Sequence, residues 1–167
     1  MLELKPLSKE GIAGALARVE RYRLLNEPEQ AESICQDILR CDADNHEALI
    51  SLLLAITDQF SGGEGPRVSE ARELLPRLKS DYDRAYYAGI ISERRGRALI
   101  NHGGPGSGFI AYEWLQDAMG WYQKAEALRP SGNDDAILRW NTCARFLMRN
   151  PHLAPAADER MEPLLLE

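Results

Sequence analysis

The sequence predicts an all-α protein, an array of antiparallel helix hairpins with about seven helices. Apolar residues recur at helical spacing in seven segments, and no segment shows the alternation of apolar and polar residues that is typical of a strand. The connections between these segments are short, which favours antiparallel packing of neighbouring helices. The chain has 167 residues, 44% of them hydrophobic, and this size and composition suit one globular domain.

The first three expected helices have distinct apolar patterns. The first runs from about Ser8, a plausible N-cap, to Leu25. The third, about His46 to Phe60, is apolar on nearly every side, which predicts a helix packed between other helices. The second, about Glu29 to Cys41, has a single apolar face formed by Ala31, Ile34, Cys35, Ile38 and Leu39.

The remaining four segments complete the expected array. The fourth helix, about Val68 to Lys79, contains Pro76, so we expect a kink or an early break there. The fifth runs from about Arg84 to Asn101 and the sixth from about Ile110 to Leu128. The seventh follows Asn133, Asp134 and Asp135, which form the cap and the acids of the first turn, and it ends near Arg149. We therefore expect one domain over residues 1–150, with three hairpins and a final capping helix, followed by a partly irregular tail over 151–167.

Charge and cysteine content restrict the partners and the compartment. The formal net charge is −6, which disfavours binding to nucleic acid or to an anionic membrane. The longest apolar stretch, Leu52 to Ile56, is far shorter than the roughly 20 residues that span a bilayer. The amino terminus lacks the pattern of a secretory signal. Three cysteines, an odd number, fit a reducing compartment, and we expect a cytoplasmic protein.

Two segments repeat one pattern of small and larger residues before a turn. In the sixth segment the pattern is formed by Ala118, Tyr122, Ala125 and Pro130. In the second segment a partial version is formed by Ala31, Cys35, Ile38 and Ala43. Small residues allow two helices to cross closely, and the larger side chain fills the space beside them.

This pattern resembles the tetratricopeptide repeat (TPR), and the resemblance extends over roughly residues 12–147. It implies a TPR-like, right-handed α-α superhelix in which the first helix of each pair lines a concave groove. The resemblance leaves two possible registers for the third hairpin, which is formed by the fifth and sixth helices. Gly89 is either the small contact residue of its first helix, or the frame is shifted by a few residues.

A groove of this kind would bind a protein or a peptide. The resemblance places side chains of the fifth and seventh helices along it, and aromatic and arginine side chains are common anchors of interfaces. The candidate partner-binding residues are Tyr86, Tyr87, Ile90, Arg94, Asn141 and Arg145. The basic run Arg94 to Arg97 has two interpretations: it binds a carboxylate, a phosphate or an acidic peptide, or it is a solvated helix face paired with Glu93 and neighbouring acids. Charge runs are usually solvated, which favours the second.

The sequence indicates no reaction centre. Gly103 and Gly108 have the spacing of a phosphate-binding loop, but Phe109 and Ile110 replace the lysine and the hydroxyl that bind phosphate and Mg²⁺. The three histidines are far apart and no pair of ligands has zinc-site spacing, so we expect no metal and no cofactor.

Aromatic and terminal apolar residues suggest a second kind of interaction. Trp114 and Trp121 lie on one face of the sixth helix, and they either pack against the seventh helix with Trp140 or form an exposed ridge. The leucines of the tail, residues 164–166, should dock on the array or on another molecule.

The sequence thus favours a non-enzymatic protein or peptide-binding module. The first alternative is a structural protein that forms a homo-oligomer through the tryptophans or the tail. The second is a small anionic-ligand binder or enzyme that uses the loop between Gly103 and Gly108.

Overall fold

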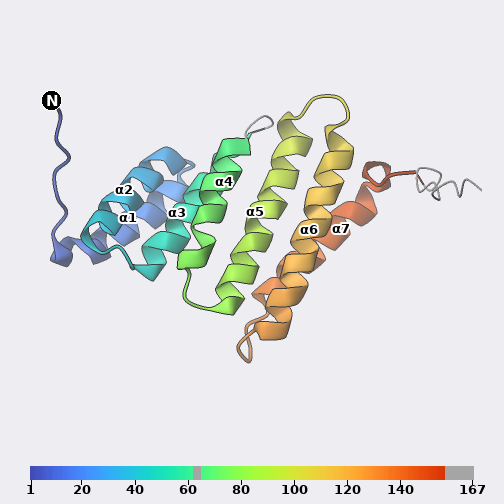
Figure 1. Cartoon of the computed structure of the whole chain (residues 1–167). Coiled ribbons are helices and arrows are strands. Elements are labelled where there is room, and N and C mark those ends of the chain that lie inside the picture. Colours follow the sequence, from blue (N-terminus) through green and yellow to red (C-terminus); the bar gives the residue numbers. More distant parts are fainter. Residues whose placement is uncertain (62–64, 157–167) are drawn as a thin grey trace, which may run out of the picture.

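The protein is an array of antiparallel α-helices, with α1 and α7 at opposite ends (Figure 1). The computed structural model describes residues 1–61 and 65–156, and this part of the chain contains seven α-helices and no strand. The predicted all-α helical array is therefore confirmed. The helices are α1 (Ile12–Leu24), α2 (Pro28–Cys41), α3 (His46–Asp58), α4 (Gly65–Glu73), α5 (Asp81–His102), α6 (Ser107–Leu128) and α7 (Asp135–Arg149).

Hydrogen bonds from side chains define where several helices begin. The Asn45 side chain accepts the Ala48 N–H at 2.9 Å, so α3 begins at the predicted place. The Ser80 hydroxyl accepts the Asp83 N–H at 3.0 Å, and α5 begins a turn earlier than predicted. Ser8 caps a 3-10 turn over Lys9–Gly11 instead of an α-helix, so α1 begins later than predicted.

The fourth helix breaks at its proline, as the sequence predicts. Helix α4 ends at Glu73 and the chain continues as a 3-10 turn, η2 (Leu75–Arg77), which contains Pro76. Proline lacks the N–H that would continue the α-helical ladder. A third 3-10 turn, η3 (Pro151–Leu153), follows α7. The tail leucines lie outside the described residues.

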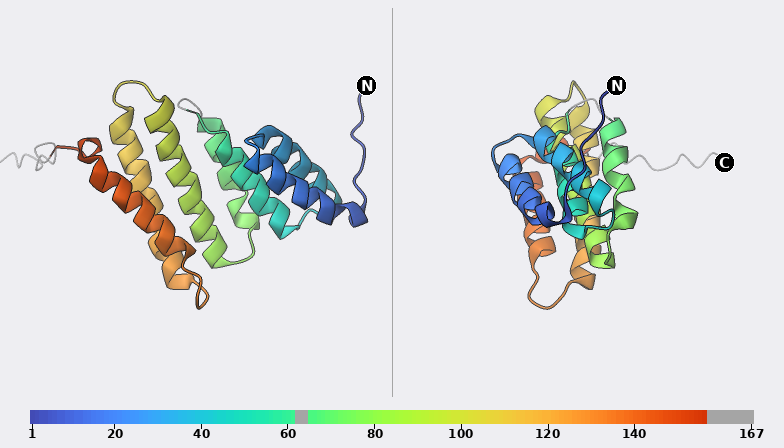
Figure 2. Two further views of the ribbon diagram at one scale, coloured as in Figure 1. Left: turned by 180° about the vertical axis from the view of Figure 1, so that it is seen from behind. Right: turned by 90° about the vertical axis from the view of Figure 1, so that its left-hand side faces the viewer.

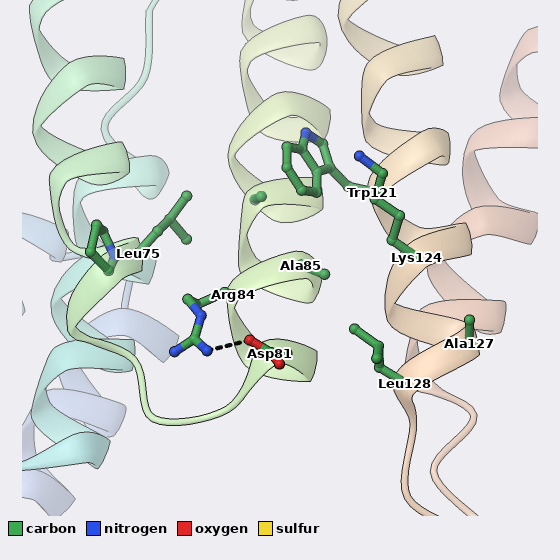
Figure 3. A pocket seen from close by; sticks show the side chains of 10 residues that line it. Leu75, Asp81, Arg84, Ala85, Trp121, Lys124, Ala127 and Leu128 are labelled. Atoms are coloured by element: carbon green, nitrogen blue, oxygen red, sulfur yellow. Dashed lines mark hydrogen bonds and ion pairs between the residues drawn. The ribbon is translucent and has the colours of Figure 1, made fainter.

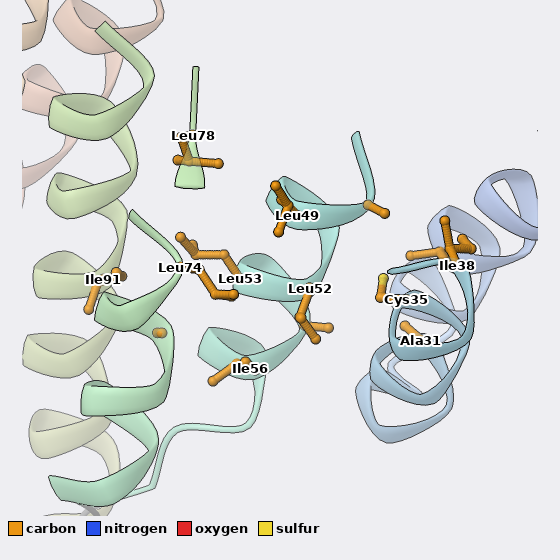
Figure 4. Packing of buried hydrophobic residues seen from close by; sticks show 14 of the residues in the cluster. Ala31, Cys35, Ile38, Leu49, Leu52, Leu53, Ile56, Leu74, Leu78 and Ile91 are labelled. Atoms are coloured by element: carbon orange, nitrogen blue, oxygen red, sulfur yellow. The ribbon is translucent and has the colours of Figure 1, made fainter. Parts of the chain in front are cut away.

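The amino-terminal half packs around α3 (Figure 4). Ala31 on α2 is fully buried, as expected for a close helix crossing, and Leu53 on α3 is fully buried as well. The predicted position of α3 between other helices is confirmed, because it packs against α1, α2, α4 and α5. We call this group of buried residues, which extends to Ile91 and Ala98 on α5, the N-terminal cluster.

A second group of buried residues, the C-terminal cluster, joins α5, α6 and α7. Its members are Ala85, Ile90, Leu115, Ala118, Tyr122, Ala125, Ala136 and Cys143. Ala118 and Tyr122 are both fully buried. Gly89 on α5 faces the ring of Tyr122: a Cβ atom at this position would lie 2.5 Å from Tyr122 Cε1. Gly89 is therefore a small contact residue between α5 and α6.

Candidate binding surface between α5 and α7

Two adjoining pockets lie between α5 and α7. Figure 2 (left) shows α7 in front of α6, with α5 beside it. The tyrosine pocket, about 340 Å³, is lined by Tyr86, Asp135, Leu138, Arg139 and Thr142. The arginine pocket, about 250 Å³, is lined by Arg97, Thr142, Arg145, Phe146 and Arg149. Because Thr142 lines both, the pockets form one continuous surface, which we call the α5–α7 surface.

Helical spacing explains which residues of α5 reach this surface. Tyr86, Ile90, Glu93 and Arg97 follow one another at intervals of three or four residues, so they lie on one side of the helix. The two in the middle, Ile90 and Glu93, are buried, at 2% and 5% exposure. The two at the ends line the pockets.

The ring of Tyr86 is held by neighbouring aromatic rings. It stacks on Tyr82 with 5.8 Å between ring centroids, and it forms a T-shaped pair with Tyr87 with 5.1 Å between ring centroids. It also packs against the buried ring of Tyr122 at 5.9 Å. Such contacts restrict the ring before any partner arrives, which lowers the entropic cost of binding.

A buried carboxylate anchors the centre of the surface. Glu93 accepts a hydrogen bond of 2.6 Å from the Tyr122 hydroxyl, and its other oxygen lies 3.6 Å from the Arg139 guanidinium. Burial and the nearby Glu93 charge both raise the pKa of Tyr122, so its hydroxyl stays protonated and donates. Burial alone would lower the pKa of Arg139, but the attraction of Glu93 and of the tyrosines outweighs it and raises that pKa.

Sequence reasoning missed Glu93 and Arg139. Their contacts join residues far apart along the chain, and each looks like an ordinary charge on a helix surface. Glu93 lies three residues before Gly96 on α5. Gly96 is another position with little space for a side chain, because a Cβ there would lie 3.1 Å from Leu115 Cγ. A polar residue on such a tightly packed helix face was the one available signal.

Of the six predicted partner-binding residues, Tyr86 and Arg145 line the pockets. Asn141 on α7 is half-buried and lines neither pocket. Tyr87 is half-buried between the two clusters, and burial raises its pKa to about 12. The prediction that Ile90 binds a partner is wrong. Ile90 belongs to the C-terminal cluster and is buried, so a partner cannot reach it.

Arg94 has a different partner from the one expected. Its guanidinium donates to the Thr57 hydroxyl at 3.1 Å and forms an ion pair with Asp58 on α3, not with Glu93. Asp58 also accepts a 2.8 Å hydrogen bond from Arg23 on α1. Burial, followed by repulsion from Arg23, lowers the pKa of Arg94 to about 10. This network connects α1, α3 and α5, so the role of Arg94 in this structure is to stabilise the packing of these helices.

The other arginines of the basic run have separate surroundings. Arg95 donates to the Ser61 carbonyl oxygen at 2.8 Å. The Arg97 guanidinium lies over the ring of Phe146, 3.9 Å from its centroid. Arg94 to Arg97 therefore do not form one solvated face. Only Arg97 reaches the α5–α7 surface.

A third pocket, which we call the apolar pocket, lies on α5 and α6 beside η2 (Figure 3). Its volume is about 670 Å³. Small side chains, Ala85 and Ala88, leave the space that Trp121, Leu75 and Leu128 surround. Most of the lining is apolar, with charged groups only at Asp81, Arg84 and Lys124.

The tryptophans of α6 do not both pack against α7. Trp114 packs against the N-terminal cluster, with the Arg72 guanidinium of α4 5.0 Å from its ring centroid. Trp121 lines the apolar pocket, where the Lys124 ammonium lies 4.3 Å from its ring centroid. Trp140 packs against the C-terminal cluster. The expected packing of both α6 tryptophans against α7 with Trp140 is therefore wrong for Trp114, whereas Trp121 packs against the C-terminal cluster, as Trp140 does.

The described residues offer neither a metal site nor a membrane-spanning helix. Among the described residues, no group of three or more histidine, cysteine and acidic side chains could hold a metal ion. No described helix is both long and apolar enough to cross a membrane. The loop between Gly103 and Gly108 joins two helices, α5 and α6, whereas the phosphate-binding loop follows a strand.

No known protein family, curated protein or solved structure matches the chain. The resemblance to the tetratricopeptide repeat stays a prediction from the sequence.

Proposed function

We propose that this protein is a non-enzymatic module that binds a segment of another protein along the α5–α7 surface. One observation carries the proposal: the two pockets adjoin at Thr142 and together present tyrosine, arginine and phenylalanine side chains. Aromatic and arginine side chains contribute most of the binding energy in many interfaces. The fixed ring of Tyr86 and the fixed guanidinium of Arg97 favour binding without large rearrangement.

The proposal includes a divergent TPR-like array. In that family the first helices of each pair line the binding groove, and α5 and α7 would be such helices. The complete burial of Ala31 and Ala118 and the close approach of Gly89 to Tyr122 are what such close crossings need. These contacts support the likeness.

The test uses peptides selected on the full chain from a random library. Thr142 is exposed and lines both pockets, so the substitution Thr142→Trp should obstruct both of them. Gln30 on α2 is also exposed, and Gln30→Trp provides the matched control. We expect the selected peptides to lose binding to T142W and to keep it with Q30W. Equal binding to both variants, or no peptide selected, would remove the proposal.

A second candidate function is self-association through the apolar pocket. It is favoured by the size of this pocket and by Leu128 at its edge, which is 52% exposed. Sedimentation should then show a dimer that Leu128→Glu abolishes. Leu24→Glu on α1, where the leucine is 81% exposed, is the control and should leave the dimer intact. A monomer at all concentrations would rule this function out.

A further inference from the structure

Three of the five residues that line the arginine pocket are arginines. Arg97 comes from α5, and Arg145 and Arg149 come from α7, where a spacing of four residues places them one turn apart on the same side. The ring of Phe146 lies under Arg97 and fixes its position. Arg145 and Arg149 are exposed to solvent, so the pocket is open to a ligand.

None of these three arginines pairs with a carboxylate within residues 1–61 and 65–156, where six other arginines do. The carboxylate one turn before Arg97 is Glu93, and its oxygens already face Tyr122 and Arg139. The chain as a whole has a net charge of −6, so this local excess of positive charge is not a property of the general surface. Like charges that line one pocket repel one another, and a bound anion would relieve that repulsion.

We infer that Arg97, Arg145 and Arg149 form a subsite for a phosphate monoester on the bound peptide segment. This inference rests on the proposed function, because it names a chemical group of the ligand at that surface. A phosphorylated side chain carries about −1.5 to −2 charges at neutral pH and three acceptor oxygens. A carboxylate carries one charge and would leave more of the cationic charge uncompensated. Guanidinium groups match phosphate oxygens with paired N–H donors, which a lysine cluster could not do.

The first arm of the test uses inorganic phosphate and the full chain. Side-chain Nε–H resonances of arginine are followed by NMR while phosphate replaces chloride at constant ionic strength. We expect saturable shifts for the three arginines, and at least about tenfold weaker binding in Arg145→Gln, because a charged hydrogen bond is lost. Arg18→Gln removes an exposed arginine from α1 and should leave phosphate binding unchanged. Shifts that do not saturate, or equal weakening in both variants, would overturn the subsite.

The second arm compares peptide libraries with a fixed central phosphoserine, glutamate or alanine. The phosphoserine library should yield ligands at least about tenfold tighter than the glutamate library, and Arg145→Gln should remove that advantage. Equal affinity for phosphoserine and glutamate ligands would overturn the assignment of a phosphate group.

The two arms separate the two proposals. Peptides that bind at Thr142 without any phosphate effect would leave the proposed function standing and refute the subsite. Saturable binding of phosphate without any peptide ligand would support an anion site and refute the proposed function.

Discussion

The contact between Gly89 and Tyr122 allows a direct test of how α5 and α6 pack. In Gly89→Ala, the new Cβ would lie 2.5 Å from Cε1 and 2.7 Å from Cδ1 of the Tyr122 ring. The ring cannot move freely, because it is fully buried and its hydroxyl donates to the buried Glu93 at 2.6 Å. The substitution must therefore overpack the contact between α5 and α6 and also displace the ring, which weakens that hydrogen bond.

The expected loss of stability follows from three contributions. Overpacking a core typically costs about 1–3 kcal/mol. Disrupting a hydrogen bond to a charged group costs about 1.5–3 kcal/mol. Replacing glycine by alanine within a helix returns about 1 kcal/mol. We therefore expect Gly89→Ala to lower the free energy of unfolding by roughly 1.5–5 kcal/mol. For a chain of this size, each kcal/mol lost should lower Tm by roughly 2–4 °C.

Urea denaturation, monitored by circular dichroism, measures this loss of stability. Gly120→Ala on α6 is the control, because nothing lies within 4 Å of its new Cβ. That variant should gain about 0.5–1 kcal/mol from helix propensity. In a Tyr122→Ala background the ring is gone, so Gly89→Ala should lose most of its cost. If Gly89→Ala were as stable as the unmodified protein, the proposed close contact between α5 and α6 would be refuted.

Two further predictions concern a partly buried carboxylate and the three thiols. Glu32 on α2, whose side chain is 16% exposed, forms a 2.7 Å ion pair with Arg67. Burial alone would raise the pKa of Glu32, but hydrogen bonds from Arg67 and Gln59 outweigh it and lower that pKa. Its contribution to stability is thus present above the unfolded-state pKa of about 4.3 and is lost as pH falls through the lower folded-state pKa. Glu32→Gln should cost about 1–2 kcal/mol at pH 7, and titration of unfolding against pH should show the two proteins converging below about pH 4. For the thiols, burial raises the pKa of Cys35 and Cys143 to about 12. A disulfide reagent at pH 8 should therefore label only the partly exposed Cys41 until urea is added, and rapid labelling of all three would contradict their burial.

The sequence predicts the scaffold well because its signals are local. Apolar periodicity locates the helices, and Pro76 marks a break that the structure contains. Small residues at Ala31 and Ala118 indicate the close crossings, and both are fully buried. Errors at helix ends arise from single capping residues such as Ser80, whose hydrogen bond extends α5 by a turn.

The α5–α7 surface is harder to predict because it depends on how helices are rotated against one another. Tyr86 and Ile90 lie on the same side of α5, yet only the first is accessible, because α6 and α7 cover the middle of that side. Periodicity gives the side of a helix and does not show which part of it a neighbour covers. The partner of Arg94 is hidden for a similar reason, since Asp58 lies on another helix 36 residues away.

Helix α5 contributes residues to both the N-terminal cluster and the C-terminal cluster. Ile91 and Ala98 pack with α1 to α4, whereas Ala85 and Ile90 pack with α6 and α7. Thermal opening can therefore start at either end of the array and proceed inward, but α5 keeps one supported side until both neighbours have separated. Its amide protons should accordingly exchange with solvent more slowly than those of any other helix, which makes α5 the element on which the cooperativity of unfolding depends.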